Sequence, residues 1–231
     1  LMHELDIPVM HDDQHGTAIV VLAALINALK VAKKNIESVR IVVNGAGPAG
    51  TAVVCLLREA GARDIVVLDS RGILARGRVY ADAYKKTLAE HSNPRKISGN
   101  LEAALHGADI FIGVSRAGAL DGTLVRIMAQ DPIIFALANP VPEIMPDEAR
   151  KAGARVVATG RSDFPNQINN ALVFPGVFRG VLDAGKSKIT MAMKKKAAFA
   201  LAHLVKKPNS AHIIPSIFDK GVARAIARAM Q

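Results

Sequence analysis

The sequence predicts an α/β fold, a doubly wound parallel sheet followed by a C-terminal helical extension. Two observations carry this prediction. Short β-branched runs alternate with helical stretches as far as Gly160, and such alternation specifies βαβ units with right-handed crossovers. After Gly160 comes a polar loop over residues 161–176, and about the last 55 residues are expected to be helices without strands.

Five strands are expected in the alternating part of the chain. Each candidate is a short apolar run rich in Val and Ile, as in strands that are covered on both faces of a parallel sheet. The runs are 39–44, 64–69, 109–114, 132–139 and 155–160. Helices are expected over 17–34, 51–61, 84–91, 100–108, 123–130 and 146–154.

The composition indicates a soluble, cytoplasmic protein. Half of the residues are apolar, which is enough to fill a large core, and Cys55 as the only cysteine excludes a disulfide framework. Its apolar neighbours predict a buried, inert thiol. No signal peptide is visible, and the longest apolar stretch, 17–29, is interrupted by Asn27 and is expected to be too short to span a bilayer.

The net charge of +10 lies almost wholly at the C-terminal end. From Lys186 onward there are eight Lys, two Arg and one Asp, a net of +9, which leaves 10 − 9 = +1 for the first 185 residues. Phe199 and Phe218 are the only aromatic residues there, so nucleic acid is not an expected partner. We expect Lys194–Lys196 to form a solvated helix edge, with docking on an acidic partner surface as the alternative.

A glycine-rich turn follows the first expected strand. Gly45, Gly47 and Gly50 form G-x-G-x-x-G, in which the first glycine allows a tight turn and the second lets the backbone approach a pyrophosphate. The third lets helix and strand pack closely. Asp69 ends the next strand nineteen residues past Gly50, where a carboxylate can accept hydrogen bonds from ribose hydroxyls. The pattern predicts a dinucleotide site; a plain turn with a capping acid is the alternative.

The residues after Asp69 bear on the choice of cofactor. Ser70 and Arg71 are cofactor-binding candidates, because Arg71 can pair with the 2′-phosphate of NADP. A solvated Arg71 is equally compatible with the sequence, so NAD and NADP both stay open, with NADP favoured. We expect a Rossmann-type dinucleotide-binding domain over residues 1–180, including the polar N-terminal loop. The helical extension, residues 181–231, is expected to pack on it.

Several blocks of the sequence resemble, in the same order, the C-terminal, cofactor-binding portion of malic enzymes, the bacterial type in particular. They extend from the first residues to about Arg179, and the helical tail is similar but less distinctive. The blocks are DIPVMHDDQHGTA, VVNGAGPAG, VLDSRG, FIGVS, FALANPVPEIMPDEA and ATGRSDFPNQINNALVFPGVFRG. The resemblance implies oxidation of L-malate with NAD(P)⁺ and decarboxylation to pyruvate and CO₂, with Mg²⁺ or Mn²⁺.

The same resemblance assigns roles to individual residues. Asp13 matches the family's metal-binding aspartate, and Asp12 matches a neighbouring carboxylate that supports the catalytic lysine. Carboxylate oxygens suit a hard divalent cation. His11 and His15 are spaced like zinc ligands on a helix, but a role in ordering the loop is the favoured interpretation.

Polar residues after the later strands complete the predicted site. Asn139 and Asn170 match family asparagines that contact substrate or nicotinamide ribose, and Asn169 is a candidate for the same role. Ser115 is a candidate cofactor neighbour. Without the family, Asn169 and Asn170 are equally interpreted as loop residues that bond their own backbone.

Part of the family's active site has no counterpart in this chain. In the family, the general-base lysine, the acid tyrosine and a Glu-Asp pair of metal ligands lie in an N-terminal domain. Tyr80 and Tyr84 are the only tyrosines, and neither matches a family motif. We therefore expect the chain to be an inactive fragment by itself, with that domain as a partner and with homo-oligomers in the complete enzyme.

Two other functions remain open from the sequence. One is a different Rossmann-type dehydrogenase, against which the HDDQHGT block argues. The other is a non-catalytic dinucleotide-binding regulatory module whose basic tail docks on a partner.

Overall fold

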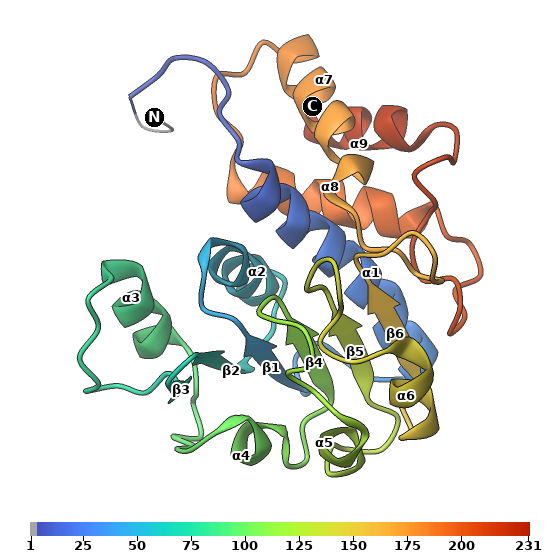
Figure 1. The fold of residues 1–231 in the computed structure, drawn as a ribbon. Helices are drawn as coiled ribbons and strands as arrows, with labels where there is room; N and C mark the ends of the chain where they lie inside the picture. Colours follow the sequence, from blue (N-terminus) through green and yellow to red (C-terminus); the bar gives the residue numbers. More distant parts are fainter. Residues whose placement is uncertain (1–3) are drawn as a thin grey trace.

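One six-stranded sheet lies at the centre of the computed structural model, which describes residues 4–231 (Figure 1). Its order is β3-β2-β1-β4-β5-β6, and all neighbouring strands are parallel except β2 and β3. The strands are β1 (Arg40–Asn44), β2 (Asp64–Asp69), β3 (Gly72–Ile73), β4 (Ile110–Gly113), β5 (Ile133–Ala136) and β6 (Val156–Thr159). The five predicted strands and the doubly wound order are confirmed.

The sixth strand, β3, was not predicted. Only Gly72 and Ile73 belong to it, and they pair antiparallel with Asp69 and Leu68. A two-residue strand has no periodicity to detect in the sequence. It exists because Gly72, at φ +105°, turns the chain back along the edge of β2.

Side chains alternate along the strands between two hydrophobic layers. In β1, Ile41 and Val43 face the layer built by α1, α2 and α8, whereas Val42 faces the layer built by α4, α5 and α6. The helices are α1 (Thr17–Ala32), α2 (Pro48–Glu59), α3 (Ala83–His91), α4 (Leu101–Leu105), α5 (Gly122–Arg126), α6 (Pro146–Lys151), α7 (Phe174–Asp183), α8 (Met191–His203) and α9 (Val222–Met230). The sheet is therefore covered on both faces, as its uninterrupted apolar strands require.

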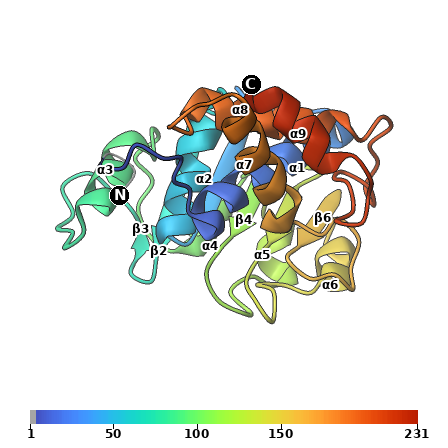
Figure 2. The ribbon, with the colours of Figure 1, turned by 90° about the horizontal axis from the view of Figure 1, so that it is seen from above.

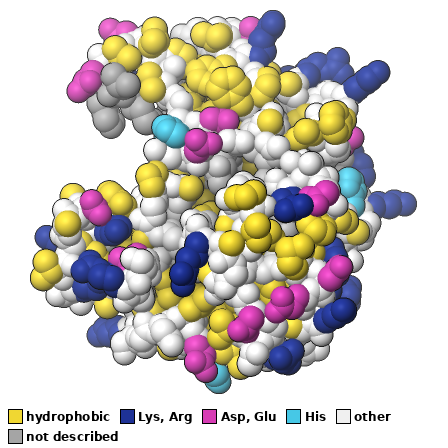
Figure 3. Space-filling view, viewed as in Figure 1, with side chains coloured by type: hydrophobic (Ala, Val, Ile, Leu, Met, Phe, Trp, Pro, Cys, Tyr) yellow, Lys and Arg dark blue, Asp and Glu magenta, His cyan; other side chains and the backbone are white. Residues whose placement is uncertain are grey.

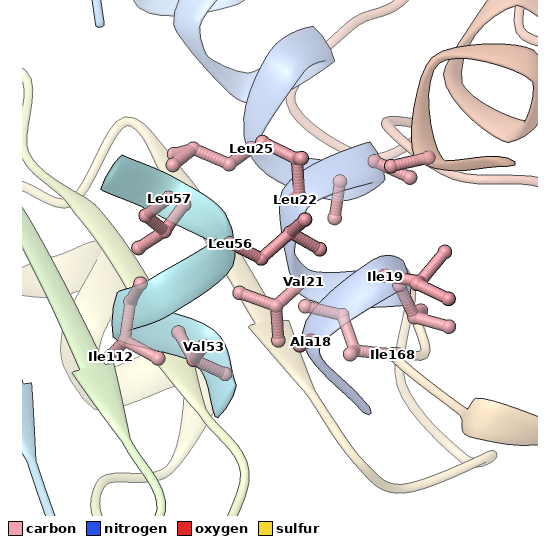
Figure 4. Packing of buried hydrophobic residues seen from close by; sticks show 14 of the residues in the cluster. Ala18, Ile19, Val21, Leu22, Leu25, Val53, Leu56, Leu57, Ile112 and Ile168 are labelled. Carbon is pink, nitrogen blue, oxygen red and sulfur yellow. The ribbon is translucent and has the colours of Figure 1, made fainter. Parts of the chain in front are cut away.

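Helix α1 is the core of the helical layer. Residues 19–25 have no exposed surface, and Leu22 and Leu25 lie beside Leu56 and Leu57 of α2 (Figure 4). Asn27 is also fully buried, and its amide donates to the carbonyls of Ala202 and Ile213, each at 2.9 Å. The polar residue that interrupts the apolar stretch therefore ties α1 to α8 and to the segment before α9.

The helix that contains this apolar stretch is longer than the stretch itself, so the expectation that it is too short to span a bilayer does not hold for the helix. A π-helical turn, Asp12–Gly16, precedes α1, and together they form a helix of 21 residues that is long and apolar enough to cross a membrane. The sequence shows only where apolar residues run together and cannot show that a helical turn is added before them. Two thirds of its most apolar 18-residue window is buried inside the protein, as in a core helix.

The C-terminal helices pack on α1 and on each other (Figure 2). Helix α8 contacts α1 and α9, and α9 lies along α7. The predicted loop over 161–176 is shorter than expected, because a 3₁₀ turn (Asn170–Leu172) and the start of α7 fall inside it. Residue 180, the predicted end of the first domain, lies within α7.

Two predictions about burial were wrong. Cys55 is exposed, because the residues of α2 that face the core are Val53, Val54, Leu56 and Leu57. Lys194 is only 5% exposed, because it lies on the inner side of α8 beside the turn 12–16 and α2, whereas Lys196 is exposed. Both errors have one cause: an apolar run shows that a helix is buried without showing which side chains face its neighbours.

Candidate functional site

The glycine turn between β1 and α2 has the geometry that a pyrophosphate needs. Gly45 has φ +129°, and a Cβ there would lie 2.5 Å from the carbonyl oxygen of Val114. A Cβ on Gly50 would lie 1.8 Å from the carbonyl oxygen of Gly45, so this glycine permits the contact of helix and strand. Around Gly47 no atom lies within 4 Å of an added Cβ, which leaves the backbone open to a ligand. Gly45 and Gly50 are thus required by contacts within the turn, and the pyrophosphate-binding role of Gly47 stays a prediction.

An open cleft of about 710 Å³ extends from this turn along the carboxyl edge of the sheet. It is lined by Gly45, Gly47, Asp69, Ser70 and Ser115, among others. Figure 3 shows an indentation between the part that carries α3 and the helices above it. The predicted residues Gly50, Arg71, Asn139 and Asn169 do not line the cleft.

Asp69 is held by cations at the end of β2. Its carboxylate accepts two hydrogen bonds from Arg78, at 2.6 and 2.7 Å, and one from the backbone N–H of Arg71, at 2.9 Å. Lys85 lies 3.9 Å away. Burial alone would raise the pKa of Asp69, but the hydrogen bonds from Arg78 and Arg71 and the nearby positive charges hold it below its usual range.

Arg78 is a site residue that sequence reasoning missed. It lies in a polar, basic segment without periodicity, so nothing in the sequence links it to Asp69. The guanidinium of Arg71, which the sequence did single out, lies 3.5 Å from the carbonyl oxygen of Val79. The carboxylate predicted to bind ribose therefore has a cationic partner within the chain.

Ser115 belongs to a network at the ends of three strands. Its hydroxyl lies 3.1 Å from the Asn44 amide, and its backbone N–H donates to Glu143 at 3.0 Å. Glu143 is fully buried, and its other oxygen accepts from the N–H of Ala138 at 3.0 Å. Glu143 was also missed; its only signal is an acidic residue inside the apolar, proline-rich run NPVPEIMP. Its carboxylate holds the loops after β4 and β5 together.

Asp13 and Asn170 meet although 157 residues separate them. The amide of Asn170 donates to the carboxylate of Asp13 at 3.3 Å, and Asp13 is exposed. Asn169 instead accepts from the N–H of Ala171 at 2.9 Å and caps the 3₁₀ turn, as its alternative interpretation predicted. The two neighbouring asparagines therefore have different contacts.

Asp12 faces inward from the same turn. Its Oδ1 is buried and has no hydrogen-bond partner in the described part of the chain. Burial, together with the charge of Asp13, raises the pKa of Asp12 against the opposing effect of His11. A buried carboxylate oxygen without a donor favours a cation supplied from outside residues 4–231.

The histidines of this turn order it. The backbone N–H of His11 lies 3.3 Å from Nδ1 of His15, and the N–H of His15 donates to the carbonyl of His11 at 2.8 Å. Burial, with the charges of Lys194 and His11, lowers the pKa of His15 to about 4. Within residues 4–231, no group of three or more His, Cys, Asp or Glu side chains could hold a metal ion.

Asn139 stands apart from the other predicted residues. It is exposed at the carboxyl end of β5, joined to Pro140 by a cis peptide bond, and its amide lies against Gly160. Its side chain makes no hydrogen bond within the part of the chain that the structure describes. The structure thus brings Asp13 together with Asn170, and it places Ser115 in the same cleft as the glycine turn. Asn139 contacts neither Asp13 nor Asn170 and does not line the cleft.

Comparison with known proteins gives one consistent family. The family model described as "Malic enzyme, NAD binding domain" matches residues 14–231. The chain is 52% identical to the bifunctional malic/malolactic enzyme of Bacillus subtilis, covering all of this chain and 57% of that protein. It is 46% identical to the NADP-dependent malic enzyme of Halomonas elongata, covering 90% of this chain and 49% of that one.

A solved structure agrees with these relatives. The crystal structure of the NAD-dependent malic enzyme of Thermotoga maritima superposes with a TM-score of 0.96 at 48% identity, over all of this chain and 61% of that one. The chain therefore spans about half to three fifths of the length of these relatives. Relatives of both cofactor types are among them.

Proposed function

The chain belongs to the malic enzyme family through its NAD-binding domain, and from this premise we propose that it supplies the dinucleotide site of a decarboxylating malate oxidoreductase. In that reaction L-malate is oxidised and loses CO₂ to give pyruvate, and the bound NAD(P)⁺ accepts the hydride. The observation that carries the proposal is the glycine turn, whose open space at Gly47 admits a pyrophosphate at the start of α2.

We further propose that NADP is the preferred cofactor. Arg78 and Lys85 lie beside the carboxylate of Asp69, Arg71 follows it in the chain, and Lys85 also pairs with Asp82 at 3.4 Å, so three positive charges stand against two negative ones at the end of β2. A 2′-phosphate adds the negative charge that this cluster lacks, whereas a 2′-hydroxyl does not. Asp69 and Ser70 are then the groups that contact the remaining hydroxyls of the ribose.

A divalent cation and malate are proposed to bind beside Asp13. Its exposed carboxylate, oriented by Asn170, suits one ligand position of Mg²⁺ or Mn²⁺. Residues 4–231 contain no complete ligand set, so the remaining ligands and the acid–base groups are assigned to the part of the enzyme outside this chain. The unpartnered oxygen of Asp12 supports a cation from that part, and Asn139 with Asn170 is proposed to face substrate and nicotinamide ribose.

Calorimetric titration of the chain with NADPH and with NAD⁺ tests the proposal. We expect saturable binding of both, with NADPH the tighter ligand by about tenfold, since charged hydrogen bonds contribute roughly 1.5–3 kcal/mol. Arg78→Gln should reduce this difference, whereas Arg63→Gln, on an exposed pair remote from the cleft, should leave it unchanged. Binding of neither nucleotide overturns the proposal, and equal binding overturns the NADP preference alone.

The cellular location is proposed to be cytoplasmic. The single, exposed Cys55 suits a compartment in which thiols stay reduced. Fractionation of cells that express the protein, followed by immunodetection, tests this point.

A further inference from the structure

A second hollow lies along α2 and begins at Pro48, next to the glycine turn. Side chains of the N-terminal turn, α1, α2 and α8 line it, and its volume is about 360 Å³. Its walls are mostly apolar and include Ala18, Pro48, Ala52, Leu56 and Met191. Nothing in the proposed reaction uses it. We call it the Lys194 groove, after the lysine that lines it.

The ammonium of Lys194 has no anionic partner in the described part of the chain. The residue is 5% exposed, and its side chain makes no hydrogen bond or ion pair within residues 4–231. Other lysines near the core are paired: Lys34 with Asp109 at 2.5 Å, and Lys195 with Glu59 at 3.3 Å. Burial lowers the pKa of Lys194, and no carboxylate opposes that effect. A buried, unpaired ammonium is costly, and an anion that reaches it would remove that cost.

The groove also defines the shape of its ligand. Lys194 is the one lysine or arginine that lines it, and beside it Gln14 offers an amide. One positive charge suits a singly charged head group better than a phosphate dianion. The apolar walls suit a hydrocarbon chain, and the volume admits roughly six to ten carbon atoms.

We propose that the Lys194 groove binds a small amphipathic monocarboxylate, with the carboxylate on the ammonium of Lys194 and the apolar chain along Ala18, Ala52 and Leu56. The groove begins at Pro48, next to the glycine turn, and shares Tyr84 with the dinucleotide cleft, but the carboxylate position at Lys194 uses no residue of the proposed malate reaction. Competing occupants are a carboxylate side chain from elsewhere in the protein and a purely apolar ligand.

Cys55 provides a direct measurement of occupancy. It is the only cysteine of the chain, it is exposed, and it lines the groove. The rate at which N-ethylmaleimide alkylates this thiol therefore reports whether the groove is filled. Sodium octanoate is the probe, and 1-octanol, which has the same chain without the charge, is its comparison.

On the complete protein that contains this chain, octanoate should slow alkylation of Cys55 saturably, and calorimetry should show one site. Octanoate should bind at least tenfold more tightly than 1-octanol. Lys194→Met should abolish this preference, while Lys195→Met, one residue along the helix, should preserve it. Ala52→Phe, which fills the groove and keeps the lysine, should weaken both ligands at least tenfold.

Three results would overturn the proposal. The first is the absence of octanoate binding to the complete protein, which means that another part of the protein fills the groove. The second is equal binding of octanoate and 1-octanol, which means that the ammonium of Lys194 does not contact the carboxylate. The third is an unchanged octanoate affinity in both Lys194→Met and Ala52→Phe, each confirmed as folded by its thermal melting curve and by NADPH binding.

Discussion

At the scale of the residue, the three motif glycines differ in the atoms that surround them. Gly45 and Gly50 are required by contacts inside the protein, since a Cβ on either would meet a backbone oxygen within 2.5 Å. Gly47 is required by nothing in the folded chain. Under the proposed function, Gly47 leaves room for a pyrophosphate to approach the backbone.

Substitution at these glycines should separate binding from stability. Gly47→Ala is expected to lower NADPH affinity at least tenfold with little change in the urea midpoint, because its methyl group occupies space left for the ligand. Gly47→Val should abolish binding. Gly50→Ala should instead destabilise the fold by about 2 kcal/mol, since its Cβ collides with the Gly45 carbonyl. Unchanged NADPH affinity in Gly47→Val refutes the assignment of the turn.

The raised pKa of Asp12 predicts that its ionised carboxylate destabilises the fold. Its folded pKa lies above the ordinary value of 3.8, so the ionised form is disfavoured by folding and the favourable contribution of this group is confined to low pH. Asp12→Asn is therefore expected to raise the urea midpoint at pH 7, by an amount that shrinks as the pH falls toward 4. Asp13→Asn, at an exposed neighbour, is the matched control and should change it less. A lower midpoint for Asp12→Asn at pH 7 contradicts the prediction.

At the scale of the element, the helical layer depends on close approach between α7 and α9. A Cβ on Gly180 would lie 2.3 Å from the carbonyl oxygen of Ala227 and 2.7 Å from the Cβ of Met230. Asn170, which bonds to Asp13, lies four residues before the start of α7. A shift of α7 on α9 would therefore move Asn170 relative to Asp13. The glycine thus links helix packing to the site.

Gly180→Ala should separate these helices. We expect a loss of roughly 1–3 kcal/mol in the free energy of unfolding, measured by urea denaturation, because the contacted atoms include backbone that cannot rotate away. Leu182→Ala lies on the same helix with 63% of its surface exposed, and it should cost less than about 0.5 kcal/mol. Equal losses in the two variants would contradict the prediction, because they would show that α7 and α9 can move apart at little cost in free energy.

At the scale of the whole molecule, the proposed function gives the chain a dinucleotide cleft and one side of a substrate site. The cleft is built within the chain, from the glycine turn and the carboxyl ends of the strands. Beside it, Asp13 is exposed and Asp12 has an unpartnered oxygen. We therefore propose that this chain binds the cofactor and that a second part of the enzyme supplies the acid–base groups.

Residues 1–231 alone should therefore bind NADPH without oxidising malate. With malate, NADP⁺ and Mn²⁺ in excess, we expect no absorbance increase at the NADPH band above the rate without protein. The hydroxyl of Tyr80 bonds to the backbone of Ala75, and Tyr84 lines the Lys194 groove with Gln14; neither tyrosine makes a hydrogen bond to Asp13 within residues 4–231. Metal-dependent turnover by the chain alone would contradict the assignment of the acid–base groups to another part.

The sequence by itself determined the features whose signals are local or periodic. The strands appear as β-branched runs, and the glycine turn and Asp69 stand at fixed offsets, because backbone conformation and the burial of a sheet act on neighbouring residues. The resemblance to malic enzymes rests on the same continuous blocks. For these reasons the fold class and the family were both predicted and confirmed.

Only the tertiary structure decided which distant side chains meet and which faces are covered. It paired Asp69 with Arg78, joined Asp13 to Asn170 and buried Lys194, while it left Cys55 exposed. None of these follows from the sequence, because a side chain's burial and partners depend on elements that pack against it from elsewhere in the chain. A helix pattern shows that α2 and α8 are amphipathic or buried; their packing decides that a lysine and a cysteine share a groove between them.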